Sequence, residues 1–123
     1  MKKQKILLVD DHKEFINAMK FLLMDTFEDQ IEYIDIAHNG RQCLEKLEIN
    51  IYDFIFMDID MPVMNGIETT RLASNMYRDL NIIALSFHSD MKYIVKMIEA
   101  GARSYIIKEE INKNTLNNLM EIA

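Results

Sequence analysis

Five short, mainly apolar runs are spaced along the sequence, and each is followed by a stretch with the apolar periodicity of a helix. The runs occupy residues 6–9, 33–36, 54–57, 82–85 and 105–107. Because they are short and largely apolar at consecutive positions, they indicate strands buried on both faces, as in parallel sheets. The first helical stretch has apolar residues at i, i+3, i+4, i+7 and i+8, namely Phe15, Ala18, Met19, Leu22 and Leu23.

The order of the segments is a strand and then a helix, repeated five times. Right-handed crossovers between such units place the strands in one parallel sheet with helices on both faces. Of the common doubly wound orders, the flavodoxin-like order 2-1-3-4-5 suits five strands. We therefore predict an α/β fold with a doubly wound five-stranded parallel sheet, in a single domain that comprises residues 1–123.

Local signals predict where several helices begin and end. Asp11 followed by Glu14 resembles a capping box before the first helix. Ser89 can cap the fourth helix, and Gly101 stands where a left-handed residue is wanted after it. We expect the third helix to end near Tyr77.

Composition narrows the class of protein. Half of the residues are hydrophobic, which suffices for one packed core, and the formal net charge of -6 argues against a general nucleic-acid binder. The only cysteine, Cys43, cannot form an internal disulfide, and we expect it in the core. The first apolar run is too short for a signal peptide, and no stretch approaches the ~20 apolar residues of a membrane span. We therefore expect a cytoplasmic protein that does not bind a membrane.

Polar side chains stand where four of the predicted strands end. Asp10 and Asp11 follow the first strand, Asp58 the third, Ser86 the fourth and Lys108 the fifth. In open α/β sheets, sites form outside the carboxyl ends of the strands, so these side chains are expected to converge. Taken one at a time, these residues have ordinary explanations. Asp10 and Asp11 could cap a helix, and Ser86 and Lys108 could be solvated polar groups at strand ends. Their joint occurrence at four strand ends is what indicates a site.

These residue types suit phosphoryl transfer. Clustered carboxylates repel one another, and Mg²⁺, which favours one or two carboxylates with waters and phosphate oxygens, relieves this repulsion. A carboxylate can also act as a nucleophile toward phosphorus, and Asp58 is the best candidate because the third strand is central in the predicted order. Lys108 and Mg²⁺ would neutralise charge, and Ser86 would donate a hydrogen bond to a phosphoryl oxygen.

Four segments together resemble the receiver (CheY-like) domain of two-component response regulators, and the resemblance covers nearly the whole chain. No single segment would suffice, but the combination is specific. The segments are Ile6-Leu7-Leu8-Val9-Asp10-Asp11, Phe56-Met57-Asp58-Ile59-Asp60-Met61-Pro62-Val63-Met64-Asn65-Gly66, Ile83-Ala84-Leu85-Ser86 and Gly101-Ala102-Arg103-Ser104-Tyr105-Ile106-Ile107-Lys108.

The resemblance implies a role for each residue at the predicted site. Asp58 accepts a phosphoryl group from a sensor histidine kinase. Mg²⁺ is held by Asp10, Asp11 and Asp58, and the backbone carbonyl of Asp60 completes the metal site. By the same resemblance the chain is not an enzyme in the usual sense, since it catalyses only its own phosphorylation and dephosphorylation.

The resemblance also implies a switch. Ser86 is the hydroxyl that moves to the phosphoryl group, Lys108 pairs with its charge, and Tyr105 changes rotamer. The surface formed by the fourth helix, the fifth strand and the fifth helix then changes and controls an output domain or an effector protein. Symmetric dimers are the commonest oligomers, but no residue of the sequence decides for or against a homodimer.

Some residues depart from the usual receiver pattern. Phe87 is large where many receivers have a small residue, and we expect its ring to shield the site. Glu109 occupies a position where many receivers have proline. Asp60 adds a negative charge near the pocket, and His88 lies on the same rim.

Several segments resemble the subfamily of response regulators that carries a C-terminal helix-turn-helix domain. They are Val9-Asp10-Asp11-His12, Leu85-Ser86-Phe87-His88-Ser89-Asp90 and Gly101-Ala102-Arg103-Ser104-Tyr105. No such domain occurs within the 123 residues, so we expect no direct binding of nucleic acid by this chain. Whether it is a stand-alone receiver or one part of a DNA-binding regulator is left open.

Two other functions fit parts of the sequence. Asp58-Ile59-Asp60 resembles the nucleophile motif of haloacid-dehalogenase-type phosphohydrolases, although that function leaves Asp10 and Asp11 unexplained. The other alternative is a phosphorylation-independent interaction module on the same fold. Such modules have usually lost an acid, the hydroxyl or the lysine, and this sequence has all of them.

Overall fold

The computed structural model describes residues 2–122 and has the predicted alternation of strands and helices. The strands are β1 Gln4–Val9, β2 Ile31–Ala37, β3 Phe54–Asp58, β4 Ile82–Ser86 and β5 Ser104–Ile107. The helices are α1 Lys13–Phe27, α2 Gly40–Ile49, α3 Gly66–Met76, α4 Met91–Ala100 and α5 Lys113–Ile122, with short 3-10 turns η1 Glu28–Gln30 and η2 Lys108–Glu110.

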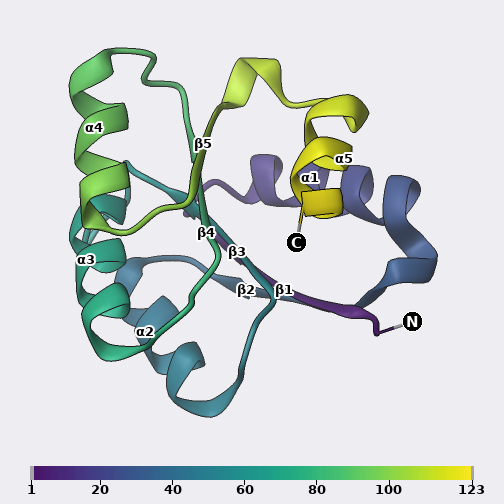
Figure 1. Cartoon of the computed structure of the whole chain (residues 1–123), viewed down its shortest axis with the longest axis horizontal. Helices are drawn as coiled ribbons and strands as arrows, with labels where there is room; N and C mark the ends of the chain where they lie inside the picture. The colour runs from purple at the N-terminus through teal and green to yellow at the C-terminus, as the bar shows by residue number, and fades with distance from the viewer. Residues whose placement is uncertain (1, 123) are drawn as a thin grey trace.

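The strands form one parallel sheet in the order β2-β1-β3-β4-β5, as predicted. Figure 1 shows the chain passing from one strand to the next through a helix each time. The register pairs Asp58 of β3 with Leu85 of β4, and Ser86 of β4 with Ile107 of β5. The carboxyl ends of these three strands therefore lie side by side at one edge of the sheet.

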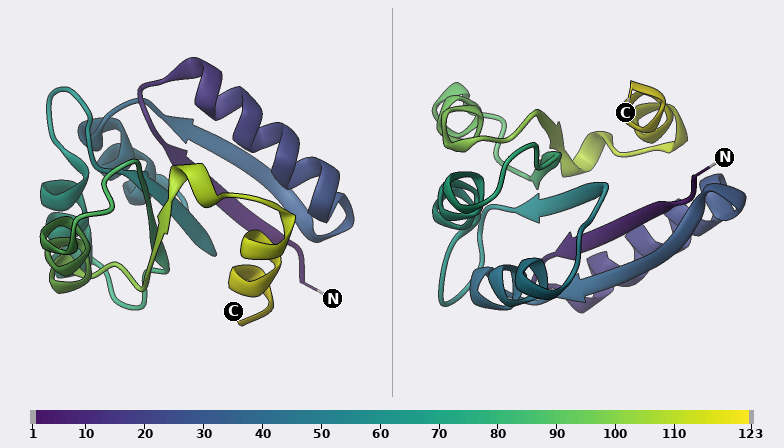
Figure 2. Two further views of the ribbon diagram at one scale, coloured as in Figure 1. Left: turned by 90° about the horizontal axis from the view of Figure 1, so that it is seen from above. Right: turned by 60° about the horizontal axis from the view of Figure 1, so that its bottom comes forward.

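Helices cover both faces of the sheet, and each face has its own hydrophobic core. Successive strand residues point to opposite faces, so Leu7 and Val9 contribute to one core and Ile6 and Leu8 to the other. The first core includes residues of α2, α3 and α4, and the second includes residues of α1 and α5. Figures 1 and 2 show the same division of the helices. Cys43 is fully buried in the first core, as predicted.

The helix ends only partly match the sequence signals. The predicted capping box at Asp11 is wrong, because the N-cap residue of α1 is His12 and no side chain makes a capping hydrogen bond there. Ser89 as the cap of α4 is also wrong, since the cap position is Asp90 and no side-chain hydrogen bond is made there. Gly101 does adopt a positive φ of 127° after α4, and α3 does end beside Tyr77.

Two asparagines cap helices that the sequence signals did not mark. The side chain of Asn39 accepts a hydrogen bond from the Gln42 N–H at the start of α2. Asn65 does the same for the N–H of Glu68 at the start of α3. Both caps satisfy backbone donors that a helix leaves free at its first turn.

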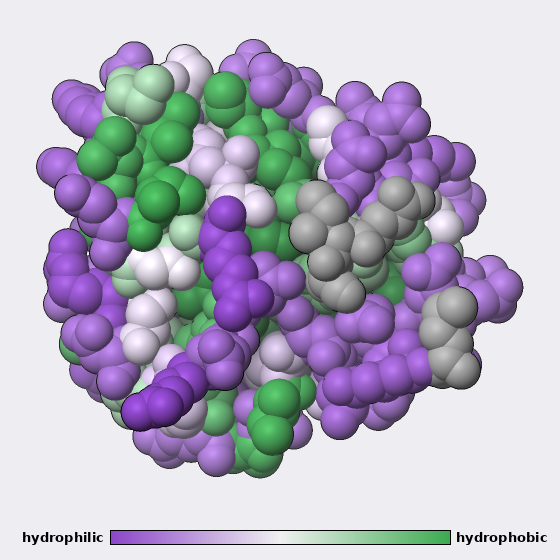
Figure 3. Space-filling model, in the orientation of Figure 1, coloured by the Kyte–Doolittle hydropathy of each residue, from purple (hydrophilic) through white to green (hydrophobic). Residues whose placement is uncertain are grey.

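The face of the molecule in Figure 3 is mainly hydrophilic, with separate apolar patches. Figure 3 shows apolar side chains gathered over the part of the molecule that holds α4, where Met91, Val95 and Ile98 are exposed. Across residues 2–122, no helix combines the length and the apolar character needed to cross a membrane.

Candidate functional site

The structure brings the polar side chains at the strand ends together around the ammonium group of Lys108. Its Nζ lies 2.7 Å from Oδ2 of Asp10 and 3.3 Å from Oδ1 of Asp58. All three side chains are at least 95% buried. Ser86, which ends β4 next to β3 and β5, is fully buried as well. Two carboxylates and one cation thus share a site from which water is largely excluded.

Two aromatic rings help to hold Lys108 in this position. Its Nζ lies 4.2 Å from the centre of the Phe15 ring and 5.3 Å from that of Phe87. Such contacts between a cation and the face of a ring are attractive. Phe87 is nevertheless 63% exposed, so its ring stands at the rim of the site. Phe15 belongs to the apolar stripe of the first helix, and this periodicity carries no signal for its contact with Lys108.

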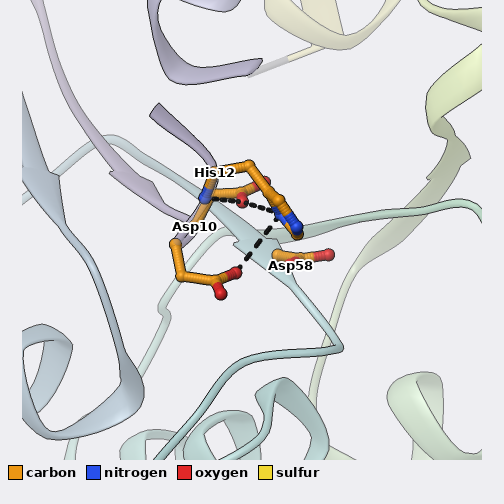
Figure 4. A group of neighbouring side chains, drawn as sticks. Asp10, His12 and Asp58 are labelled. Carbon is orange, nitrogen blue, oxygen red and sulfur yellow. Dashed lines mark hydrogen bonds and ion pairs between the residues drawn. The ribbon is translucent and has the colours of Figure 1, made fainter. Parts of the chain in front are cut away.

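An acidic cluster lies beside the lysine and fits a divalent cation. One ligand atom from each of Asp10, Asp11, His12 and Asp58 lies within 4.8 Å of every other (Figure 4). Oδ2 of Asp58 and Oδ1 of Asp11 are buried and have no hydrogen-bond partner among the described residues. Buried carboxylate oxygens without a partner are costly, and oxygen ligands of this kind are what Mg²⁺ prefers. The residues present therefore fit the expected Mg²⁺.

The electrostatics of Asp58 reflect this crowding. Burial, followed by the neighbouring Asp10 carboxylate, raises the pKa of Asp58 from 3.8 to about 6, although Lys108 acts in the opposite direction. One ammonium therefore does not fully compensate two buried carboxylates. A further positive charge at this site would lower the free energy of the ionised form.

The loop after β4 is tied to three other parts of the molecule through His88. The N–H of His88 donates to Oγ of Ser86 (3.0 Å), and its carbonyl accepts from the hydroxyl of Tyr105 (2.7 Å). Its ring lies 2.6 Å from Oδ2 of Asp60 and stacks on Tyr93 of α4 at 3.9 Å. Ser86 and Tyr105 are thus connected through one loop residue.

Sequence reasoning placed Asp60 and His88 on the rim but did not foresee that they pair. They follow neighbouring strands, which indicates that they lie at the same edge of the sheet but not that their side chains pair. The side chain of Asp60 is 68% exposed and points to His88. This leaves its backbone carbonyl, rather than its carboxylate, as the group expected at the metal.

Gly66 is a further residue of the site that the sequence analysis did not single out. A Cβ atom there would lie 2.0 Å from the carbonyl oxygen of Asp58. The N–H of Gly66 also donates to the carbonyl of Ile59, at 2.7 Å. The start of α3 therefore packs directly against the backbone of Asp58, and a larger residue would displace that backbone.

Comparison with known proteins agrees with this geometry. The response regulator receiver domain family matches the chain over residues 6–121. The transcriptional regulatory protein DegU of Brevibacillus brevis is 35% identical over 107 residues, which are 87% of this chain and 44% of that protein. The chain spans about half or less of the length of the curated relatives that it matches, from 29% to 54%.

Solved structures show the same fold. A CheY-like response regulator receiver domain protein from Methanospirillum hungatei JF-1 superimposes with a TM-score of 0.85 at 26% identity, covering 98% of this chain and 93% of that one. The receiver domain of the sensor histidine kinase PA1611 from Pseudomonas aeruginosa PAO1, with a magnesium ion in its active site cleft, gives a TM-score of 0.85 at 24% identity, covering 98% and 96%. With the family match over nearly its whole length, the chain belongs to the response regulator receiver domain family, whose members act in two-component signalling by phosphorylation.

Proposed function

We propose that Asp58 is the phosphoacceptor of this receiver and takes a phosphoryl group from a sensor histidine kinase. The observation that carries the proposal is the environment of the Asp58 carboxylate. It is buried, its Oδ1 faces Lys108 and its Oδ2 has no hydrogen-bond partner among the described residues. A carboxylate oxygen that the protein leaves without a partner is free to attack phosphorus.

The acids around Asp58 would hold the metal that this reaction needs. Asp10, Asp11 and Asp58 supply carboxylate oxygens, and the family resemblance adds the carbonyl of Asp60. When bound, Mg²⁺ neutralises negative charge on the transferring phosphoryl group and orients its oxygens. The unpartnered Oδ1 of Asp11 supports this assignment.

Lys108 and Ser86 would act on the phosphoryl group directly. The ammonium of Lys108 already lies 3.3 Å from Asp58 and would pair with the charge that the phosphoryl group brings. The Ser86 oxygen accepts a hydrogen bond from His88, and its own O–H remains available to donate. Ser86 is the last residue of β4, and Lys108 is the first residue after β5.

Movement of Ser86 would pass to the surface through His88, because His88 contacts both Tyr105 and Tyr93. Phosphorylation can shift this arrangement only by its different contacts in the two states. The affected surface comprises α4, β5 and α5, which includes the exposed Met91, Val95 and Ile98. An output domain or effector protein is the partner we propose for it.

We also propose a domain organisation, a range of activity and a cellular location for this chain. Residues 1–123 would fold as a single domain that makes no contact with nucleic acid, and whose only catalysis is its own phosphorylation and dephosphorylation. A cytoplasmic location agrees with the single cysteine, which stays reduced there.

Intact mass after incubation with Mg²⁺ and acetyl phosphate tests the assignment of Asp58. We expect a labile gain of one phosphoryl group, about 80 Da, that is lost in Asp58→Asn and in the absence of Mg²⁺. Asp60→Asn is the matched control, because its exposed carboxylate pairs with His88, and it should still be labelled. Labelling that survives in Asp58→Asn would show that another residue is the acceptor. Repeated turnover of small phosphate esters would instead favour a phosphohydrolase.

A further inference from the structure

His12 places an imidazole nitrogen directly against the carboxylates that are expected to hold the metal. Its Nδ1 lies 3.1 Å from Oδ1 of Asp10 and 3.3 Å from Oδ1 of Asp11. Figure 4 shows the ring among the carboxylate groups, with Asp58 beside it. A ring nitrogen of His12 is thus one of four potential ligand atoms that lie within 4.8 Å of one another.

A second observation concerns the hydrogen bonds within this cluster. One neutral imidazole carries a single N–H, on either Nδ1 or Nε2, so Nδ1 donates to at most one of the two carboxylates that it contacts. In the tautomer with the proton on Nε2, Nδ1 has a lone pair that can bind a metal. Oδ1 of Asp11 makes no hydrogen bond with it, and Oδ2 of Asp58, on a residue that is 4% exposed, has none from any described residue. Hydrogen bonds within the cluster thus leave two buried acceptor oxygens unsatisfied.

The chemistry of the donor set goes beyond what Mg²⁺ uses. Mg²⁺ takes oxygen ligands and keeps several of its waters. Imidazole instead favours first-row transition metals, for which the affinity of a given site rises from Mn²⁺ through Co²⁺ to Ni²⁺. Carboxylate oxygens suit Mg²⁺ and Mn²⁺, whereas a nitrogen ligand adds affinity selectively for the later metals.

We propose that His12 is a ligand in the metal site of this receiver, and that its Nδ1 gives the site a preference for first-row transition dications over Mg²⁺. The inference rests on the proposed function to the extent that the same three carboxylates hold the ion. It adds a ligand, and a metal selectivity, that the oxygen-only site does not have. His12 is 63% exposed, so its ring can turn toward a bound ion without disturbing the core.

Binding of Mg²⁺ and Co²⁺ at one fixed pH, measured by calorimetry on the whole chain, tests the proposal. His12→Gln keeps a polar side chain and removes the nitrogen ligand. Loss of a residue that merely supports a metal ligand typically costs 10- to 100-fold in metal affinity, and loss of a ligand itself should cost at least as much. We therefore expect His12→Gln to weaken Co²⁺ binding at least about tenfold, and to change Mg²⁺ binding less than about threefold.

His38→Gln is the matched control, because His38 is exposed and lies outside the acidic cluster. It should leave both affinities unchanged. Pulsed electron paramagnetic resonance of bound Mn²⁺ provides an independent signature, since a directly bound nitrogen modulates the signal. That modulation should be present in the wild type and in His38→Gln, and absent in His12→Gln.

The outcomes separate the two proposals. If Mg²⁺ and Co²⁺ bind and His12→Gln weakens both equally or neither, His12 is not a ligand, while the oxygen-only site stands. If the nitrogen modulation persists in His12→Gln, the ligand is misassigned and the inference is overturned. If neither metal binds to the wild type, the metal site of the proposed function fails along with it.

Discussion

Replacing Asp58 with Asn should stabilise the metal-free protein at neutral pH, although it removes the proposed phosphoacceptor. Burial and the neighbouring Asp10 raise the pKa of Asp58 from 3.8 to about 6. Each pKa unit corresponds to about 1.4 kcal/mol between the two protonation states. Keeping this group ionised therefore costs the folded protein about 3 kcal/mol well above pH 6. Asn has nearly the same shape and no charge, so we expect a gain of about 1 to 3 kcal/mol, at the lower end if its contact with Lys108 is weak.

The stability gained by Asp58→Asn should increase with pH. Because the pKa of Asp58 is higher in the folded state than in the unfolded state, the folded protein binds the proton more tightly. The stability of the wild type accordingly falls as the pH rises from about 4 to about 6, and this loss is complete above that range. The Asn variant has no such group, so the two proteins should differ little near pH 4 and most above pH 7.

Urea unfolding followed by circular dichroism, in EDTA at about pH 5, 6 and 7.5, measures the difference. Asp29→Asn is a suitable control, because Asp29 is exposed and lies before β2, at the end of the sheet opposite the site. A destabilised Asp58→Asn variant at pH 7.5 would refute the reasoning, as would a gain that is the same at pH 5 and 7.5. Saturating Mg²⁺ should narrow the gap, since a ligand at 100 times its Kd stabilises the wild type by about 2.7 kcal/mol.

Three further substitutions or reactions test other parts of the structure. Lys108→Met removes the buried cation between Asp10 and Asp58, and should lower the free energy of unfolding in EDTA by about 3 kcal/mol; a loss below about 1 kcal/mol would contradict the ion-pair geometry. Gly101→Ala forces an L side chain to a φ of 127° and into the Ser74 side chain, so a loss of about 1 to 3 kcal/mol is expected by urea titration, and a neutral result would speak against this conformation. Burial raises the pKa of the Cys43 thiol to about 12, so a thiol reagent should label it in urea and only very slowly in native buffer; rapid native labelling would mean that it is accessible.

The fold and the centre of the site were predictable because both follow from the positions of the strands in the sequence. In a parallel sheet, the residue after each strand reaches the same edge, so the positions of Asp10, Asp58, Ser86 and Lys108 in the sequence were enough to bring them together. Only the apolar runs had to be recognised, and their observed bounds differ from the predicted ones by at most two residues.

The features that could not be predicted from the sequence are those that depend on side-chain and loop conformation. Asp11 and Ser89 have the right residue types for helix caps, but the structure begins both helices one residue later. The pairing of Asp60 with His88 joins two loops, and loop conformation has no period that a sequence pattern can report. The contact of Phe15 with Lys108 likewise depends on the rotamer of a residue whose helical position has an equally good explanation in the core.

The electrostatic conflict at Asp58 links stability, metal binding and switching. Asp10 and Asp58 are buried against one ammonium group, so the metal-free site carries more negative than positive charge. A cation that relieves this repulsion binds more tightly because the repulsion exists. By the thermodynamic cycle, a substitution changes the free energy of Mg²⁺ binding by the difference between its effects on the stability of the metal-free and of the metal-bound protein. Asp58→Asn, which removes the repulsion beforehand, should therefore weaken Mg²⁺ binding by at least the amount by which it stabilises the metal-free protein. A site filled with well-packed apolar residues would be more stable. Neither the metal nor the phosphoryl group could then bind there, so neither could shift the loop at His88 by its contacts.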